Sequence, residues 1–356
     1  MIIKSGIELI CFTELGFHHN DFIKLNIKLL LRQPFPTIMN IIIFSKDCDN
    51  STNQVIDWLT WHAHTPIRIN HYSDFFQLFN RVGIDNNNIS FIHNLKSEFG
   101  IWYRRRGVLA GTSELDNIDT ETHYHLKEEL LSLFQFCFDE LEESSKISLG
   151  SKNGSRINKL LVLKHARKSG LKIPNTLITN QKNILTEFLK KQDSLITKPI
   201  SEATMFMSKL QERHVMYTEE YAEDENTETE PIFFPSLFQK NISKKIDIRT
   251  YYLNGVCYSM AIFSQQSEMS RTDFRVYDTV NKVRNVPYKL PKEIEKKIVM
   301  LMKSLALSEG SLDFIQTTDD EIIFLEVNPA GQFGMVSKPC NYYLEEKIAL
   351  YFNGKQ

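Results

Sequence analysis

The sequence predicts an α/β protein, in the broad sense that includes α+β arrangements, built from several lobes. Strand-like apolar runs alternate with helical stretches in the first third of the chain, as in sheets flanked by helices. Further along, Asn254-Gly255 separates two alternating runs, which is the strongest short-range signal for a β-hairpin. The length of 356 residues exceeds what one hydrophobic core usually serves, so we expect two or three lobes.

Composition argues against several classes of function. The net charge of −2 gives no support for a nucleic-acid or anionic-membrane partner. No apolar run approaches the roughly 20 residues that a membrane span needs, and acidic residues come too early for a signal peptide. The cysteines are odd in number and widely spaced, which predicts reduced thiols in a cytoplasmic protein: Cys11, Cys48, Cys137, Cys257 and Cys340.

Residues 1–115 predict an N-terminal α/β lobe. Its expected strands are 7–13, 41–45, 67–70 and 89–92, and its expected helices include 21–31 and 74–82. The lobe ends near the run Arg104-Arg105-Arg106, which follows two aromatic residues. Such a run suits a phosphate or a peptide carboxylate, and a solvated turn fits the local sequence at least as well.

Residues 116–154 predict a helix, 123–143, and then a linker, 144–154, rich in Ser, Gly, Lys and Asn. A central lobe is expected over 155–240. It begins with a basic amphipathic helix, 158–169, for which Gly170 is a suitable cap.

Two features of the central lobe suggest binding. Lys198 ends an apolar strand, where a lysine either reaches a phosphate or simply meets solvent. Residues 206–211 and 214–220 predict a hairpin that runs into the acidic stretch 219–230. The edge of such a hairpin suits an extended peptide that adds a strand, although the acidic stretch also fits a solvated loop.

Residues 241–356 predict a C-terminal lobe. Strands 246–253 and 256–263 flank the Asn-Gly turn, and helices are expected at 291–307 and 343–352. Arg249 lies among aromatic residues on the first strand, where it either clamps a phosphate or carboxylate or pairs with Asp247. The long polar stretch 264–290 is a lid candidate.

The stretch 311–334 predicts a hairpin with an oxygen-rich face. Asp313 and Glu326 are equidistant from the turn centred on Asp319-Asp320, so they should face each other, and Asn328 should share their side. Two carboxylates and an amide oxygen suit Mg²⁺, whose other positions go to water and phosphate. The alternative is a pair of strand carboxylates that face solvent, but opposed like charges destabilise a sheet without a cation.

The sequence from 155 to 354 resembles the ATP-grasp ligases through an ordered set of residues: Lys198, Phe238-Gln239-Lys240, Arg249, Asp313, Glu326 and Asn328. Four longer segments are similar to the branch that makes microviridin-type peptide crosslinks: IWYRRRG at 101–107, KLLVLKHARKSGLKIPNTLITN at 159–180, VRNVPYKLP at 283–291 and LEVNPAGQFGMVSKPCNYYLEEKIA at 325–349. Essentially the whole chain resembles the grasp-with-spasm peptide maturases. The resemblance implies an ATP-grasp fold preceded by a pre-ATP-grasp α/β lobe.

The resemblance also implies ATP and Mg²⁺ as cofactors and a role for each matching residue. Lys198 and Lys240 would contact the ATP phosphates or base region, and Gln239 would lie in the hinge that binds adenine through backbone groups. Arg249 would stabilise the transferring phosphoryl group or the acyl phosphate. Arg284, in an Arg-x-Val-Pro-Tyr element, would hold the acceptor or a phosphate. The Mg²⁺ ligands would be Asp313, Glu326 and Asn328.

The implied activity is that of a macrocyclase acting on a ribosomal precursor peptide. It would activate Asp or Glu side chains as acyl phosphates and join them to Ser or Thr hydroxyls (ω-ester) or Lys amines (ω-amide). The leader of the precursor would dock near 206–220, and family analogy suggests a homodimer. Two alternatives stay open: a ligase that adds a free amino acid to a small molecule or protein terminus, and a nucleotide-gated peptide-binding protein without turnover.

Overall fold

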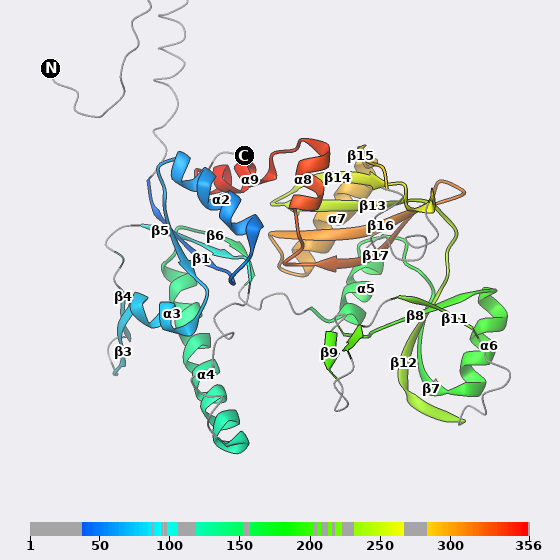
Figure 1. The fold of residues 1–356 in the computed structure, drawn as a ribbon, viewed down its shortest axis with the longest axis horizontal. Helices are drawn as coiled ribbons and strands as arrows, with labels where there is room; N and C mark the ends of the chain where they lie inside the picture. Colours follow the sequence, from blue (N-terminus) through cyan, green and yellow to red (C-terminus); the bar gives the residue numbers. More distant parts are fainter. Residues whose placement is uncertain are drawn as a thin grey trace, which may run out of the picture. The chain divides into compact units, whose positions relative to one another are not determined.

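Five β-sheets organise the residues that the structure describes (Figure 1). This computed structural model describes residues 38–354 apart from 87–88, 94, 96–97, 106–118, 152–156, 202–204, 208–212, 216–217, 223–230 and 267–282. The strand expected at 7–13, the helix expected at 21–31 and most of the stretches 219–230 and 264–290 therefore lie outside the described residues.

The first sheet is parallel, with strand order β2-β1-β5-β6. Its strands are β1 (Asn40–Phe44), β2 (Thr65–Ile69), β5 (Phe99–Tyr103) and β6 (Ile147–Gly150). Its main helices are α2 (Asn50–Trp61), α3 (Tyr72–Leu78) and α4 (Thr120–Ser144). A parallel sheet needs cover on both faces, and β1 is accordingly apolar on both. Ile42 and Phe44 pack with α3 and α4, whereas Ile41 and Ile43 pack with α2.

A four-stranded antiparallel sheet follows, with order β11-β8-β12-β7. Its strands are β7 (Thr176–Gln181), β8 (Leu195–Lys198), β11 (Glu219–Tyr221) and β12 (Ile232–Lys240). Helix α5 (Lys159–Lys168) precedes the sheet in the chain. Helix α6 (Lys182–Gln192) packs on it through Leu185, which is buried with Leu195 and Phe238.

The last large sheet has five antiparallel strands in the order β15-β14-β13-β16-β17. They are β13 (Lys244–Leu253), β14 (Val256–Ile262), β15 (Asn285–Tyr288), β16 (Glu309–Thr317) and β17 (Ile322–Asn328). The accompanying helices are α7 (Lys292–Ser304), α8 (Gly334–Cys340) and α9 (Leu344–Phe352). Side chains such as Ile248 and Phe314 pack with α5 and α7 on one face. On the opposite face Tyr251 packs with α8 and α9. The rest of that face has space for polar residues.

Several sequence expectations needed correction. The helix expected at 74–82 ends at Leu78, where the chain becomes β3 (Phe79–Ile84) and pairs with β4 (Ile89–His93). The expected linker 144–154 contains β6, because Ile147 and Leu149 extend the parallel sheet beside β5. Residues 285–288 of the expected long loop form β15. Helix α8 was not expected, since its Pro339 argues against a helix.

The hairpin expected at 206–211 and 214–220 is only partly confirmed. Strands β9 (Met205–Met207) and β10 (Arg213–Val215) pair with each other, with Phe206 opposite His214. The next residues leave this hairpin, because β11 pairs with β8 instead. Among the residues that the structure describes, no helix combines the length and apolar character needed to cross a membrane.

Candidate active site

The β16–β17 hairpin places Asp313 opposite Glu326 and Ser311 opposite Asn328. The pairing that we expected is confirmed, but the turn alone does not produce it. Near the turn Gln316 pairs with Ile322 and Phe314 with Phe324, a register that would set Asp313 against Leu325. A β-bulge at Leu325 shifts the register by one residue. A slip of one residue moves a side chain to the other face, so the bulge decides that Glu326 meets Asp313.

Among the described residues, Arg249 and Lys159 form ion pairs with these carboxylates. Arg249 lies opposite Asp313 on β13, and its Nη1 is 3.2 and 3.3 Å from the two carboxylate oxygens. Lys159, the first residue of α5, has its Nζ 3.7 Å from Oε2 of Glu326. The expected alternative, Arg249 paired with Asp247, gives way to an ion pair of Asp247 with Lys244 at 2.7 Å. Each of the two carboxylates thus has at least one cationic partner among the described residues.

The donor set fits Mg²⁺. Asp313 is buried, Glu326 is one-fifth exposed and Asn328 is exposed, so the row opens toward solvent at one end. Asn328 Oδ1 accepts a hydrogen bond of 3.0 Å from the Ala330 amide and keeps a second lone pair for a cation. In the described part of the chain no group of three or more His, Cys, Asp or Glu side chains is arranged to hold a metal. Two carboxylates and an amide form a set that phosphate oxygens and water can complete.

A cavity of about 270 Å³ adjoins the same hairpin. Gln239, Lys240 and Asn241 line it at the end of β12, and Ile315 and Leu325 line it from β16 and β17. Gln239 is fully buried, and its Nε2 donates a 2.9 Å hydrogen bond to Thr176 Oγ1. The cavity thus joins the expected hinge residues to the hairpin that carries Asp313 and Glu326.

The remaining predicted residues lie at two other places. Lys198 is the last residue of β8, opposite Leu237 on the strand that carries Gln239 and Lys240. Arg284 precedes β15, is exposed, and stacks its guanidinium over the Phe263 ring at 5.7 Å. Among the described residues, no contact links Arg284 to Arg249, Asp313 or Glu326, which together are called the carboxylate row.

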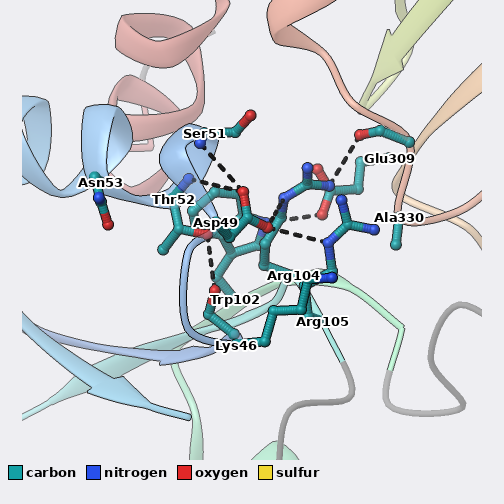
Figure 2. Close-up of polar contacts among 12 residues, drawn as sticks. Lys46, Asp49, Ser51, Thr52, Asn53, Trp102, Arg104, Arg105, Glu309 and Ala330 are labelled. Atoms are coloured by element: carbon teal, nitrogen blue, oxygen red, sulfur yellow. Dashed lines mark hydrogen bonds and ion pairs between the residues drawn. The ribbon is translucent and has the colours of Figure 1, made fainter.

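Two arginines of the run, Arg104 and Arg105, form ion pairs with Asp49 (Figure 2). Arg104 is 1% exposed, so the solvated-turn interpretation is wrong for this residue. Its Nε lies 3.5 Å from the Asp49 carboxylate, and Arg105 reaches the same oxygen at 3.0 Å. Asp49 also caps α2 by accepting from the Ser51 and Thr52 amides. Arg106 lies outside the described residues.

A buried carboxylate, Glu309, lies at the start of β16 on the same face as Asp313. It accepts a 2.8 Å hydrogen bond from Trp102 Nε1 and another from the Tyr251 hydroxyl. Burial raises the pKa of Glu309, and the positive charge of Arg104 opposes that rise. The polar face of the last sheet therefore runs from the candidate site to the arginine run of the first sheet.

Sequence reasoning missed Lys159, Asp49 and Glu309. Lys159 could have been found from the sequence, because it follows the N-cap residue Asn158 at the start of an amphipathic helix. Asp49 and Glu309 could not, because their partners lie far away in the sequence.

Replacing Lys159 with Met should tighten the binding of Mn²⁺ in the absence of nucleotide by up to about fivefold. The ammonium would compete with a cation bound at Glu326, and such a partly exposed pair is worth up to about 1 kcal/mol. Mn²⁺ binding followed by electron paramagnetic resonance tests this. Lys164→Met, an exposed position on the same helix, is the matched control. Equal affinity in both variants would remove Lys159 from the site.

The fold and the site together define a class of protein: the chain has the fold of the ATP-grasp ligases. A Chryseobacterium gregarium RiPP-associated ATP-grasp ligase, solved with ADP and a leader and core peptide, aligns with a TM-score of 0.71 and 24% identity over 89% of this chain and 96% of that one. Macrocyclase MdnC of Microcystis aeruginosa, bound to precursor peptide MdnA, gives 0.68 and 25% over 88% and 99%.

A further similar structure is the ATP-grasp ligase PsnB with a minimal precursor, Mg and ADP. Its TM-score is 0.66 at 16% identity, over 88% of this chain and 97% of PsnB. No protein-family model and no curated protein matches the sequence.

Proposed function

We propose that this chain is an ATP-dependent macrocyclase that joins Asp or Glu side chains of a ribosomal precursor peptide to Ser or Thr hydroxyls or to Lys amines. One observation carries the proposal: the hairpin that bears Asp313 and Glu326 also lines a cavity of about 270 Å³ at Gln239 and Lys240. The fold, which is shared almost end to end with solved peptide macrocyclases, supports the same proposal.

The chemistry requires activation because a carboxylate has no adequate leaving group. Its oxygen attacks the γ-phosphorus of ATP, ADP leaves, and an acyl phosphate remains. The peptide hydroxyl or amine then attacks the acyl carbon, loses its proton, and releases phosphate. Phosphoryl transfer asks the protein mainly to position the reactants and to neutralise charge. Excluding water protects the acyl phosphate from hydrolysis.

The proposed roles follow from where the residues lie. Asp313, Glu326 and Asn328 would hold Mg²⁺, which supplies charge neutralisation at the phosphates. Arg249, already aimed at Asp313, would face the transferring phosphoryl group or the acyl phosphate. Arg284, at the end of the segment 267–282, would hold the acceptor or a phosphate.

For the nucleotide we propose three residues at the ends of adjacent strands. Lys240 lines the cavity at the end of β12, and Lys198 ends the antiparallel neighbour β8, where it lies opposite Leu237 rather than opposite Lys240; both would contact the ATP phosphates or base region. Gln239 would mark the hinge whose backbone groups hydrogen-bond adenine. Its buried side chain is held by Thr176, so the hinge backbone is fixed before ATP binds.

Incubation of the protein with ATP, Mg²⁺ and a candidate precursor, read by mass spectrometry, tests the proposal. Each bond formed should lower the peptide mass by one water and release one ADP. ADP formation with an unchanged peptide mass would contradict crosslinking. Addition of the mass of a free amino acid would favour the alternative ligase. Peptide binding that depends on nucleotide without turnover would favour the gated binding protein.

We also propose that the leader docks beside β9, β10 and β11. Strand β11 is an edge of its sheet, and an exposed edge accepts an extended peptide as an added strand. Removing the leader from the precursor should therefore lower crosslinking efficiency at low precursor concentration by at least about tenfold, because the core must then bind alone. Adding the leader as a separate peptide is the control. Unchanged efficiency without any leader would reject this docking site.

The organisation of the chain is part of the proposal. We place the lobes at 1–115, 155–240 and 241–356, with the helix and linker at 116–154 between the first two. We further propose a cytoplasmic homodimer without a nucleic-acid or membrane partner. Sedimentation equilibrium of the purified protein tests the oligomeric state.

A further inference from the structure

Arg104, which directly follows β5, holds the segment that comes after the proposed metal hairpin. Arg104 Nη1 donates a 2.9 Å hydrogen bond to the carbonyl oxygen of Gly331, three residues after Asn328. The guanidinium also lies 5.0 Å from the centre of the Phe333 ring. Both contacts are buried, and both fall within 328–333.

The turn at 328–331 has little freedom. Asn328 Oδ1 accepts from the Ala330 amide at 3.0 Å, and its carbonyl oxygen accepts from the Gly331 amide at 3.1 Å. Gly331 packs so closely on β16 that a Cβ there would overlap the Ser311 side chain. If the Gly331 carbonyl moved, the turn would therefore move with it, and the position of the Asn328 side chain would change.

We propose that Arg104 is a positioning residue for the Mg²⁺ site: it fixes the 328–331 turn, and thereby the side-chain oxygen of Asn328. The inference rests on the proposed function only in taking Asn328 as a metal ligand. An arginine suits this role because its planar guanidinium donates to the Gly331 carbonyl and lies over the Phe333 ring, while its charge forms an ion pair with Asp49. Groups that orient metal ligands typically change metal affinity by about 10- to 100-fold.

A matched pair of variants tests this inference. Arg104→Lys keeps the charge near Asp49 but loses the planar group that holds Gly331. Arg105→Lys makes the same chemical change at the neighbouring residue, which also pairs with Asp49. Binding of a non-hydrolysable ATP analogue is measured by calorimetry over a series of Mg²⁺ concentrations and in EDTA. Thermal melting of each variant reports whether it is folded.

Arg104→Lys should raise the Mg²⁺ concentration for half-maximal enhancement of binding by about tenfold. The affinity in EDTA should stay within twofold of wild type, and Arg105→Lys should match wild type in both measurements. The same Mg²⁺ dependence in the two variants would overturn the inference, since both arginines would then serve the fold alone.

Two further outcomes keep the inference testable. If Arg104→Lys does not fold, the double variant Asp49→Asn/Arg104→Gln removes both charges and keeps a helix cap, and the same shift is expected. An unshifted Mg²⁺ dependence in that variant overturns the inference. Wild-type binding that ignores Mg²⁺ would overturn the metal site and the inference together. Normal Mg²⁺ dependence without crosslinking would contradict the proposed function alone.

Discussion

Asp313→Asn and Glu326→Gln should each reduce crosslinking by roughly 10²–10³-fold or more, because in the proposed site each would lose a charged ligand of the Mg²⁺ that neutralises the phosphates. Both replacements keep the size of the side chain and a carbonyl oxygen that can still accept a hydrogen bond, so the protein should fold, with Asp313→Asn less stable because buried Arg249 loses a charged partner. The initial rate of peptide mass loss measures the effect. Thermal melting separates it from unfolding.

The same hairpin supplies matched controls. Asp319→Asn lies in the exposed turn, and Glu321→Gln lies in an exposed pair with Lys172. Both variants should crosslink at close to the wild-type rate. Full activity in Asp313→Asn or Glu326→Gln would remove that residue from the metal site. Equal losses in all four variants would point to a damaged hairpin instead.

Asp49→Ala should lower the free energy of unfolding by up to about 3–5 kcal/mol, since it removes one of the two carboxylates that compensate the buried charge of Arg104. It also removes the cap of α2, which alone is worth about 1 kcal/mol. Urea denaturation measures the change. Asp57→Ala, at an exposed position on the same helix, is the control and should cost much less. A similar cost at both positions would reject the buried ion pair as the cause.

The stability difference between wild type and Asp49→Asn should depend on pH. Burial alone would raise the pKa of Asp49, but Arg104, Arg105 and the Thr52 amide outweigh it and hold the pKa below 3.8. The stabilisation is therefore present above pH 3.8 and is lost as the pH falls through the folded pKa. Glu309 has the opposite sign. Burial raises its pKa, so its contribution is present below pH 4.5 and declines as the pH rises through the folded pKa.

The carboxylate row could be predicted because its information is local. Asp313 and Glu326 lie in one hairpin, and alternation alone assigns their side of the sheet. The sequence left two possible kinds of partner for Arg249. Only the pairing of β13 with β16 shows that Asp313 lies opposite it. The bulge at Leu325 could not be predicted, since nothing in the local sequence distinguishes it from regular strand.

The features that the sequence did not predict depend on distant partners. Arg104 is buried because it forms an ion pair with Asp49 and a hydrogen bond with Gly331. Asp49 precedes Arg104 in the sequence, and Gly331 follows it. Residues 147–150 become a strand only because β5 offers a free edge. The chain between 74 and 82 keeps helical periodicity, yet it switches to a strand at Phe79 because β4 pairs with it.

The bulge has a mechanical consequence. It turns two consecutive side chains toward one face: Leu325, which lines the cavity, and Glu326, which faces Asp313. A molecule that presses on Leu325 therefore acts on the same peptide unit that aims Glu326. Linkage then requires reciprocity: any cation held by Glu326 must favour the cavity's occupant by the same factor by which the occupant favours the cation. The extra residue in β17 would thus couple the binding of a cation at Glu326 to the binding of a nucleotide in the cavity.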